Sequence, residues 1–170
     1  MTSTQLNIFE ANSKPKLQPI DTFQLSLDGA SRNNPGPAGA GICIKKNTQL
    51  IMATGAYLGH KTNNQAEYLA LLLGLFFVKQ FLKSDDVLHI KSDSELLVKQ
   101  ILGHYKIKNP ELQKLHGLGL KFLKNIKYKI EHVLREKNKE ADEQANLAVD
   151  KKIKLPKEFV EILNEHNIII

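Results

Sequence analysis

Cysteine is almost absent from this sequence, and long hydrophobic runs are missing. The 170 residues include one cysteine, Cys43, so disulfides within the chain are excluded and a reducing cytoplasm is the expected location. The longest apolar run, residues 68–78, is too short to cross a bilayer and predicts a buried core helix. The N-terminus shows no basic start followed by an apolar core, so no secretion signal is recognised. We therefore expect a protein without membrane contacts.

Acidic residues are outnumbered by basic ones. The chain has 18 Asp and Glu against 24 Lys and Arg, which gives a formal net charge of +6. A basic excess favours phosphate-rich partners, although lysine-rich surfaces are also common on proteins that bind no nucleic acid. One group of lysines could line a backbone-binding face or form an ordinary solvated face, and charge alone leaves both open: Lys121, Lys124, Lys127 and Lys129.

The spacing of apolar residues predicts an α/β domain. Three early strands are separated by short turn segments, whereas two later strands arrive through helices. The first three should therefore form an antiparallel meander, and the later two should run parallel to the first. We predict a mixed five-stranded sheet flanked by helices. The predicted strands are residues 23–28, 38–46, 50–58, 86–93 and 127–134, and turn residues fill 29–37.

The chain divides into three predicted segments. Residues 1–21 are polar and form a flexible N-terminal arm, and residues 22–153 form the folded domain. Residues 154–170 form a C-terminal extension. Within it, residues 157–165 place Phe159, Ile162 and Leu163 on one side, which predicts a short helix that docks on the domain.

Four acidic residues stand at special positions in this layout. Asp28 interrupts an apolar strand, and Asp93 ends the fourth strand. Glu67 and Asp142 lie in the first turns of two predicted helices. Because strand ends and helix starts gather around one crevice in an open α/β sheet, these carboxylates are expected to meet there. Each alone has an ordinary explanation as a turn residue, a cap or a partner of a helix dipole.

The sequences around these carboxylates resemble the four blocks of the type 1 ribonuclease H family. The blocks are DGASRNNPGPAGAG (28–41), TNNQAEY (62–68), IKSDSELLVKQI (90–101) and HVLREKNKEADEQANLA (132–148). They occur in the family's order and cover roughly residues 22–150. The resemblance implies a ribonuclease H-like fold, with residues 22–153 as the catalytic domain.

The resemblance also implies an activity and a cofactor. It implies an endonuclease that hydrolyses the RNA strand of RNA–DNA hybrids and leaves 5′-phosphate and 3′-hydroxyl ends. Two Mg²⁺ ions would be held by Asp28, Glu67, Asp93 and Asp142, with Mn²⁺ as a possible substitute. Crowded carboxylates repel one another unless cations neutralise them, and hard oxygen ligands suit these ions.

Five further residues match substrate-binding positions of the family. Asn34, Asn63 and Asn64 match positions that contact the minor groove and the RNA 2′-hydroxyls, which asparagine can serve as both donor and acceptor. Thr62 and Asn109 match positions that hold a phosphate of the DNA strand. All five are also suited to turns or helix caps, and the two roles are compatible.

Two departures point to a handle-less bacterial or archaeal-like form. The loop before Asp142 has no glycine-flanked histidine, and Arg135 stands where the archaeal-type branch has an arginine. We therefore expect Arg135 to assist product release or leaving-group chemistry. The basic helix-and-loop handle is missing, because Gly103 leads almost directly to Asn109. Because the loop is archaeal-like, double-stranded RNA stays an alternative second substrate.

Two other hypotheses remain at this point. One is a nuclease of the same fold that acts on double-stranded RNA or branched DNA. The other is a non-catalytic nucleic-acid-binding domain, which is disfavoured because all four acidic positions are intact. We expect a monomer in either case.

Overall fold

Five strands form one sheet in the order β3-β2-β1-β4-β5. β1 pairs antiparallel with β2, and β2 with β3, whereas β1–β4 and β4–β5 are parallel. The predicted mixed sheet is therefore confirmed. The computed structural model describes residues 19–170, so residues 1–18 of the predicted arm lie outside the described residues. The strands are β1 (Thr22–Ser31), β2 (Gly36–Lys46), β3 (Gln49–Lys61), β4 (Val87–Ser92) and β5 (Lys127–His132).

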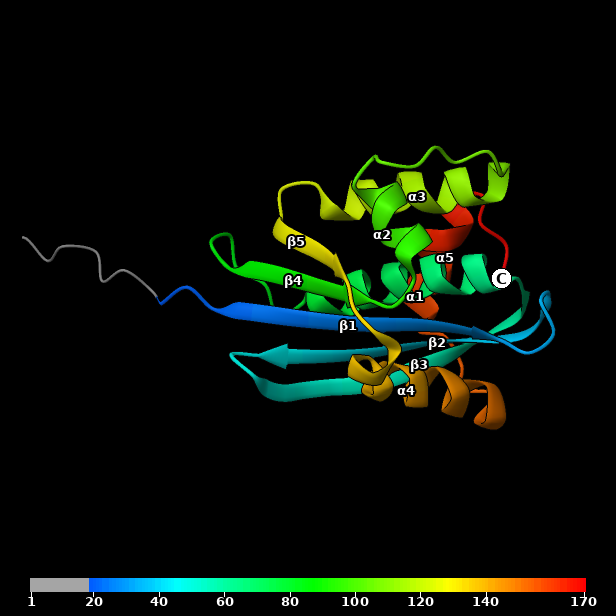
Figure 1. The fold of residues 1–170 in the computed structure, drawn as a ribbon, viewed down its shortest axis with the longest axis horizontal. Coiled ribbons are helices and arrows are strands. Elements are labelled where there is room, and N and C mark those ends of the chain that lie inside the picture. Colours follow the sequence, from blue (N-terminus) through cyan, green and yellow to red (C-terminus); the bar gives the residue numbers. More distant parts are fainter. Residues whose placement is uncertain (1–18) are drawn as a thin grey trace, which may run out of the picture.

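Helices cover the two faces of the sheet unequally (Figure 1). α1 packs on β1 and β2 from one side, together with α2, α3 and α5, and α4 packs on β2 and β3 from the other. The apolar run of α1 is buried between the sheet and α3, as the sequence predicts for a core helix. The helices are α1 (Asn63–Val78), α2 (Glu95–Ile101), α3 (Pro110–Leu123), α4 (Lys139–Lys151) and α5 (Lys157–Glu165).

Several predicted boundaries are wrong. The segment 29–37 is mostly strand: β1 runs to Ser31, which pairs with Ala38 of β2, and only residues 32–35 form the connection. Glycine and proline usually mark turns, but Gly29, Gly36 and Pro37 lie within the two strands of this hairpin. α1 begins after Thr62, so Glu67 is its fifth residue and lies beyond the first turn.

The C-terminal helix packs as the sequence predicts. α5 buries Phe159 and Leu163 in the main hydrophobic core, and Ile168 follows them there. The backbone between α4 and α5 is also tied to the sheet, since Tyr57 N donates to Ile153 O at 2.7 Å. Among residues 19–170, none of the helices has the length and apolar character needed to cross a membrane.

Candidate active site

Three carboxylates meet at one end of the sheet. Asp28, Glu67 and Asp93 each place one oxygen within 4.8 Å of the others. Asp28 lies near the carboxyl end of β1, and Asp93 directly follows β4, the parallel neighbour of β1. Because adjacent parallel strands end at the same edge, the topology brings these two side chains together. Glu67 reaches them from α1.

Gly29 allows α1 to come this close. A side chain at residue 29 would run into the backbone of Ala66 and Glu67. The Asp-Gly pair therefore supplies a carboxylate at residue 28 and a bare backbone at residue 29, against which the Glu67 backbone packs. The contact sets the spacing between β1 and α1 that brings together the acidic cluster of Asp28, Glu67 and Asp93.

The cluster is short of positive charge. Burial, followed by the neighbouring charges of Asp93 and Asp142, raises the pKa of Asp28 from 3.8 to about 7. Burial and the charges of Asp28 and Asp93 also raise the pKa of Glu67 well above its usual value. Glu67 Oε2 is buried and has no hydrogen-bond partner among the described residues.

These observations fit a bound divalent cation. An ion at this point would offset both the burial and the repulsion that raise these pKa values, and it would coordinate the unpartnered oxygen. The three candidate ligands are all hard carboxylate oxygens, which Mg²⁺ and Mn²⁺ prefer to softer donors.

Asp142 and Arg135 form a pair beside the cluster. Arg135 Nη2 donates to Asp142 Oδ1 at 2.9 Å, and the two residues come from the turn before α4 and from its first turn. Asp142 is not one of the three residues whose oxygens gather within 4.8 Å. It nevertheless contributes to the raised pKa of Asp28, so its charge is felt in the cluster.

Asn138 is a site residue that the sequence interpretation missed. Its side chain is buried, and Nδ2 donates both to Leu27 O at 2.8 Å and to Asp93 Oδ1 at 2.9 Å. It stands at the N-cap of α4 but makes no side-chain cap bond. An asparagine just before a helix is the usual mark of a cap, so the sequence alone hides this contact.

The five predicted substrate-binding residues lie on two exposed helix starts and on the β1–β2 connection. Asn34 Oδ1 accepts from Asn63 N at 3.0 Å, which joins that connection to the start of α1. Thr62 forms a capping box with Gln65, and Asn109 Oδ1 caps α3 by accepting from Leu112 N at 3.1 Å. Asn64 is exposed beside Asn63. Cap or connection roles are therefore present for Thr62, Asn109 and Asn34, whereas Asn63 and Asn64 are the first two residues of α1.

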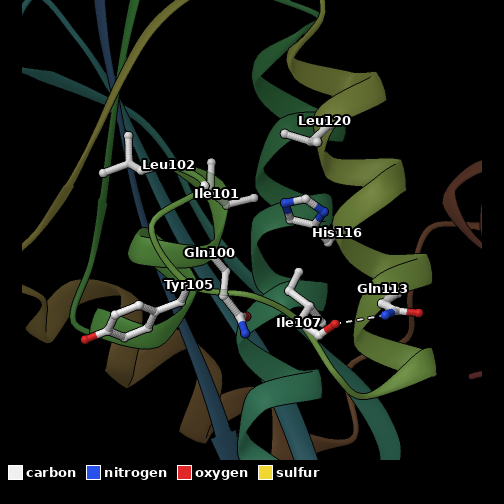
Figure 2. A pocket seen from close by; sticks show the side chains of 9 residues that line it. Gln100, Ile101, Leu102, Tyr105, Ile107, Gln113, His116 and Leu120 are labelled. Carbon is white, nitrogen blue, oxygen red and sulfur yellow. Dashed lines mark hydrogen bonds between the residues drawn. The ribbon is translucent and has the colours of Figure 1, made fainter.

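Two pockets differ in character. One has a volume of about 360 Å³ and is lined by the cluster and its neighbours: Asp28, Gly29, Ala30, Ser31, Arg32, Asn63, Glu67, Asp93, Arg135 and Asn146. The other, of about 370 Å³, lies between α2 and α3 and is mostly apolar (Figure 2). Its polar groups include Gln113, whose Nε2 donates to Ile107 O at 2.8 Å. None of the predicted site residues lines this second pocket.

Comparisons with known proteins agree with this geometry. The model of the reverse transcriptase-like family matches residues 26–148. Ribonuclease HI of Halobacterium salinarum is 36% identical over 126 residues, which cover 73% of this chain and 62% of that protein. A bifunctional protein of Mycobacterium tuberculosis is 36% identical over 132 residues, 74% of this chain and 35% of that protein. The chain thus spans about a third to two thirds of these curated relatives.

Solved structures give the same result. RNase H1 from Halobacterium salinarum superposes with a TM-score of 0.73 at 33% identity, covering 76% of this chain and 98% of that one. LC11-RNase H1, solved in complex with an RNA/DNA hybrid, gives 0.72 at 36% identity, covering 76% and 97%. Since the family model spans most of the domain and these structures share its fold, the chain belongs to the type 1 ribonuclease H family.

Proposed function

We propose that this protein is an endonuclease that hydrolyses the RNA strand of RNA–DNA hybrids and leaves 5′-phosphate and 3′-hydroxyl ends. The observation that carries the proposal is the meeting of Asp28, Glu67 and Asp93 in one pocket. Relatives named ribonuclease HI, and a solved relative that holds an RNA/DNA hybrid, support the substrate.

The proposed cofactor is Mg²⁺, two ions per site, with Mn²⁺ as a substitute. Asp28, Glu67 and Asp93 would hold the ions, and Asp142 would join them by exchanging its bond to Arg135 for the cofactor. Bound divalent cations supply a lowered pKa for water and positive charge against the scissile phosphate.

The remaining proposed roles belong to polar residues around the pocket. Arg135, freed from Asp142, would lie beside the leaving group or the product phosphate, where a guanidinium offsets developing negative charge. Asn63 and Asn64 are exposed at the start of α1 and can both donate to and accept from a 2′-hydroxyl. Asn34 would act with them from the β1–β2 connection.

Thr62 and Asn109 are proposed to hold a phosphate of the DNA strand. Both are N-caps, of α1 and α3, so backbone N–H groups without intrahelical partners lie close to each side chain. Asn109 caps through Oδ1, so its Nδ2 hydrogens stay available for a phosphate, whereas the Thr62 hydroxyl donates to Gln65 Oε1 at 3.1 Å and would exchange that partner for the phosphate.

A substrate panel tests the function. One labelled sequence is presented as an RNA–DNA, an RNA–RNA and a DNA–DNA duplex, with Mg²⁺ or with a chelator. We expect Mg²⁺-dependent cutting of the RNA strand of the hybrid and no cutting of the DNA duplex, because only RNA offers the 2′-hydroxyl. Binding without cutting would support a non-catalytic domain, and preferential cutting of RNA–RNA would assign a different substrate.

We also propose that the protein acts as a monomer in the cytoplasm. Its single cysteine, Cys43, is free and buried in β2, which is compatible with a reducing compartment. Sedimentation of the purified protein, with and without a hybrid, tests the oligomeric state.

A further inference from the structure

Two arginines line the pocket of the acidic cluster, and a carboxylate of α4 holds each of them. Arg135 is paired with Asp142, as described above. Arg32, from the β1–β2 connection, donates to Asp150 Oδ1 at 2.6 Å. Residues 142 and 150 lie roughly two helical turns apart and so share one side of α4. Only the first pair has a role in the proposed chemistry.

The backbone around Arg32 is firmly placed. Its own N–H donates to Pro37 O at 2.9 Å, and Ser31 Oγ donates to Lys61 O at 2.7 Å. Asn34 joins the same connection to the start of α1. The guanidinium itself is accessible, because the Arg32 and Asp150 side chains are 49% and 53% exposed. Arg32 is thus a solvent-accessible cation on a fixed backbone.

Stability alone is a poor explanation for this pair. Ion pairs with both side chains about half exposed contribute little to folding, since solvent screens them. The location is more informative. The pocket gathers three carboxylates, and its negative potential opposes the approach of a nucleic-acid phosphate. A guanidinium at the same pocket offers that phosphate a planar, bidentate partner.

We propose that Arg32 contacts a backbone phosphate of the strand that enters the acidic pocket. In the free protein Asp150 is the counterion of this guanidinium, and the phosphate displaces Asp150 on binding. The proposal rests on the proposed function, because it assumes a nucleic-acid substrate, and it adds a cation to the pocket that Asn63 of α1 also lines.

The test is equilibrium binding of a labelled RNA–DNA hybrid in Ca²⁺, which fills divalent sites without supporting cleavage, at several salt concentrations. Arg32→Ala should weaken binding by about five- to tenfold near 0.1 M salt and lower the slope of log K against log salt by about one unit, since one released counterion is lost. Arg32→Lys should keep the slope but recover only part of the affinity, because the bidentate geometry is gone.

Two controls separate substrate contact from local structure. Asp150→Asn breaks the same ion pair but leaves the cation, so it should bind the hybrid as tightly as the wild type or more tightly. Lys45→Ala removes an equal charge from a pair with Glu140 of the same helix, at 2.6 Å and outside the pocket. It should bind like the wild type. Thermal unfolding of each variant checks that it is folded, and Arg32→Gln replaces Arg32→Ala if the latter is not.

The outcomes are distinct. Unchanged affinity and slope for Arg32→Ala, or an equal loss for Arg32→Ala and Asp150→Asn, would overturn the phosphate contact while leaving the nuclease assignment intact. A wild-type protein that neither binds nor cuts the hybrid would overturn both the proposed function and this contact.

Discussion

Asp28 is the residue in which fold and chemistry meet most closely. It pairs with Gly41 across the β1–β2 ladder, and directly opposed residues project to the same side of a sheet. Its side chain therefore points to the face that α4 covers, between Asp93, which directly follows β4, and the start of α4. No other position along β1 combines burial, two carboxylate neighbours and a following glycine.

The stability of the metal-free protein should depend on pH through Asp28. The pKa of Asp28 is raised to about 7 from 3.8, so its contribution to stability is complete below pH 4 and is lost as the pH rises through 7. Near pH 8 in chelator, Asp28→Asn should therefore be more stable than the wild type by roughly 2–4 kcal/mol. The gain should vanish near pH 4. Thermal unfolding of both proteins between pH 4 and pH 8 measures this difference in stability. A difference that stays the same at every pH would contradict the prediction.

Asn138 should matter through Asp93. Asn138→Ala removes the donor that fixes the Asp93 carboxylate, and partners of this kind typically contribute 10- to 100-fold to metal affinity or activity. We expect a fall in kcat of about that size, a rise in the Mg²⁺ concentration needed for half-maximal rate, and little change in KM for the hybrid. Asn164→Ala, at an exposed position of α5, is the control. If Asn138→Ala needs the same Mg²⁺ concentration as the wild type, Asn138 has a structural role only.

For single residues, the sequence predicted those site residues that a local pattern of neighbours identifies. The acidic positions stood out because four blocks of neighbouring residues accompany them. Asn138 did not, since its importance lies in a partly buried contact with Asp93, 45 residues away. The mutual contact of Asn34 and Asn63 was hidden for the same reason.

At the scale of elements, α4 depends on a stripe of small residues. A side chain at Gly41 would run into the backbone of Ala141 and Ala145. The helix that carries Asp142 can therefore approach β2 only because glycine and alanine face each other. This close packing fixes how near Asp142 lies to the acidic cluster.

Gly41→Ala should push α4 outward. We expect a loss of about 1–3 kcal/mol in the free energy of unfolding, as for other overpacked cores, together with a reduced cleavage rate. Gly117 is the matched control, because it is helical, exposed and has nothing within 4 Å of an added Cβ. Gly117→Ala should stabilise α3 by up to about 1 kcal/mol. Chemical denaturation measures the free energy of unfolding of both variants. An equal change in the two would contradict close packing of α4 at Gly41.

Element types followed from periodicity, but several boundaries did not. The long apolar helix, the parallel strands and α5 were predicted correctly. The β1–β2 hairpin was underestimated because glycine usually marks a turn, whereas here Gly36, Gly39 and Gly41 lie inside β2. Gly39 and Gly41 serve the close approach of α4, which is a tertiary requirement that no local pattern shows.

For the whole molecule, the basic excess is partly neutralised at the surface. Lys127 pairs with Asp85 at 3.0 Å, and Lys129 with Glu131 at 3.6 Å. The connection between α2 and α3, residues 102–109, contains no further helix that could act as a basic handle. Two of the four lysines considered for a backbone-binding face are therefore held in surface ion pairs, and residues 102–109 supply no handle helix.

Hybrid binding should accordingly be weak, with a shallow salt dependence. Each phosphate contact contributes about 0.9 to the slope of log K against log salt, so few contacts give a small slope. Removing residues 1–20, which include Lys14 and Lys16, should leave affinity and slope unchanged. Binding isotherms in Ca²⁺ for the full chain and for a chain that starts at Asp21 measure this. A clear drop in both would show that the N-terminal segment replaces the handle.

The most direct test of the account is single-turnover cleavage of a labelled RNA–DNA hybrid by the wild type and by Asp28→Asn across a range of Mg²⁺ concentrations. If the cluster of Asp28, Glu67 and Asp93 is the catalytic centre, the wild type should cut only with a divalent cation. The variant, although folded, should be slower by at least about a thousandfold, which corresponds to about 4 kcal/mol of lost transition-state stabilisation. An Asp28→Asn protein that cuts the hybrid at a near wild-type rate would contradict the account.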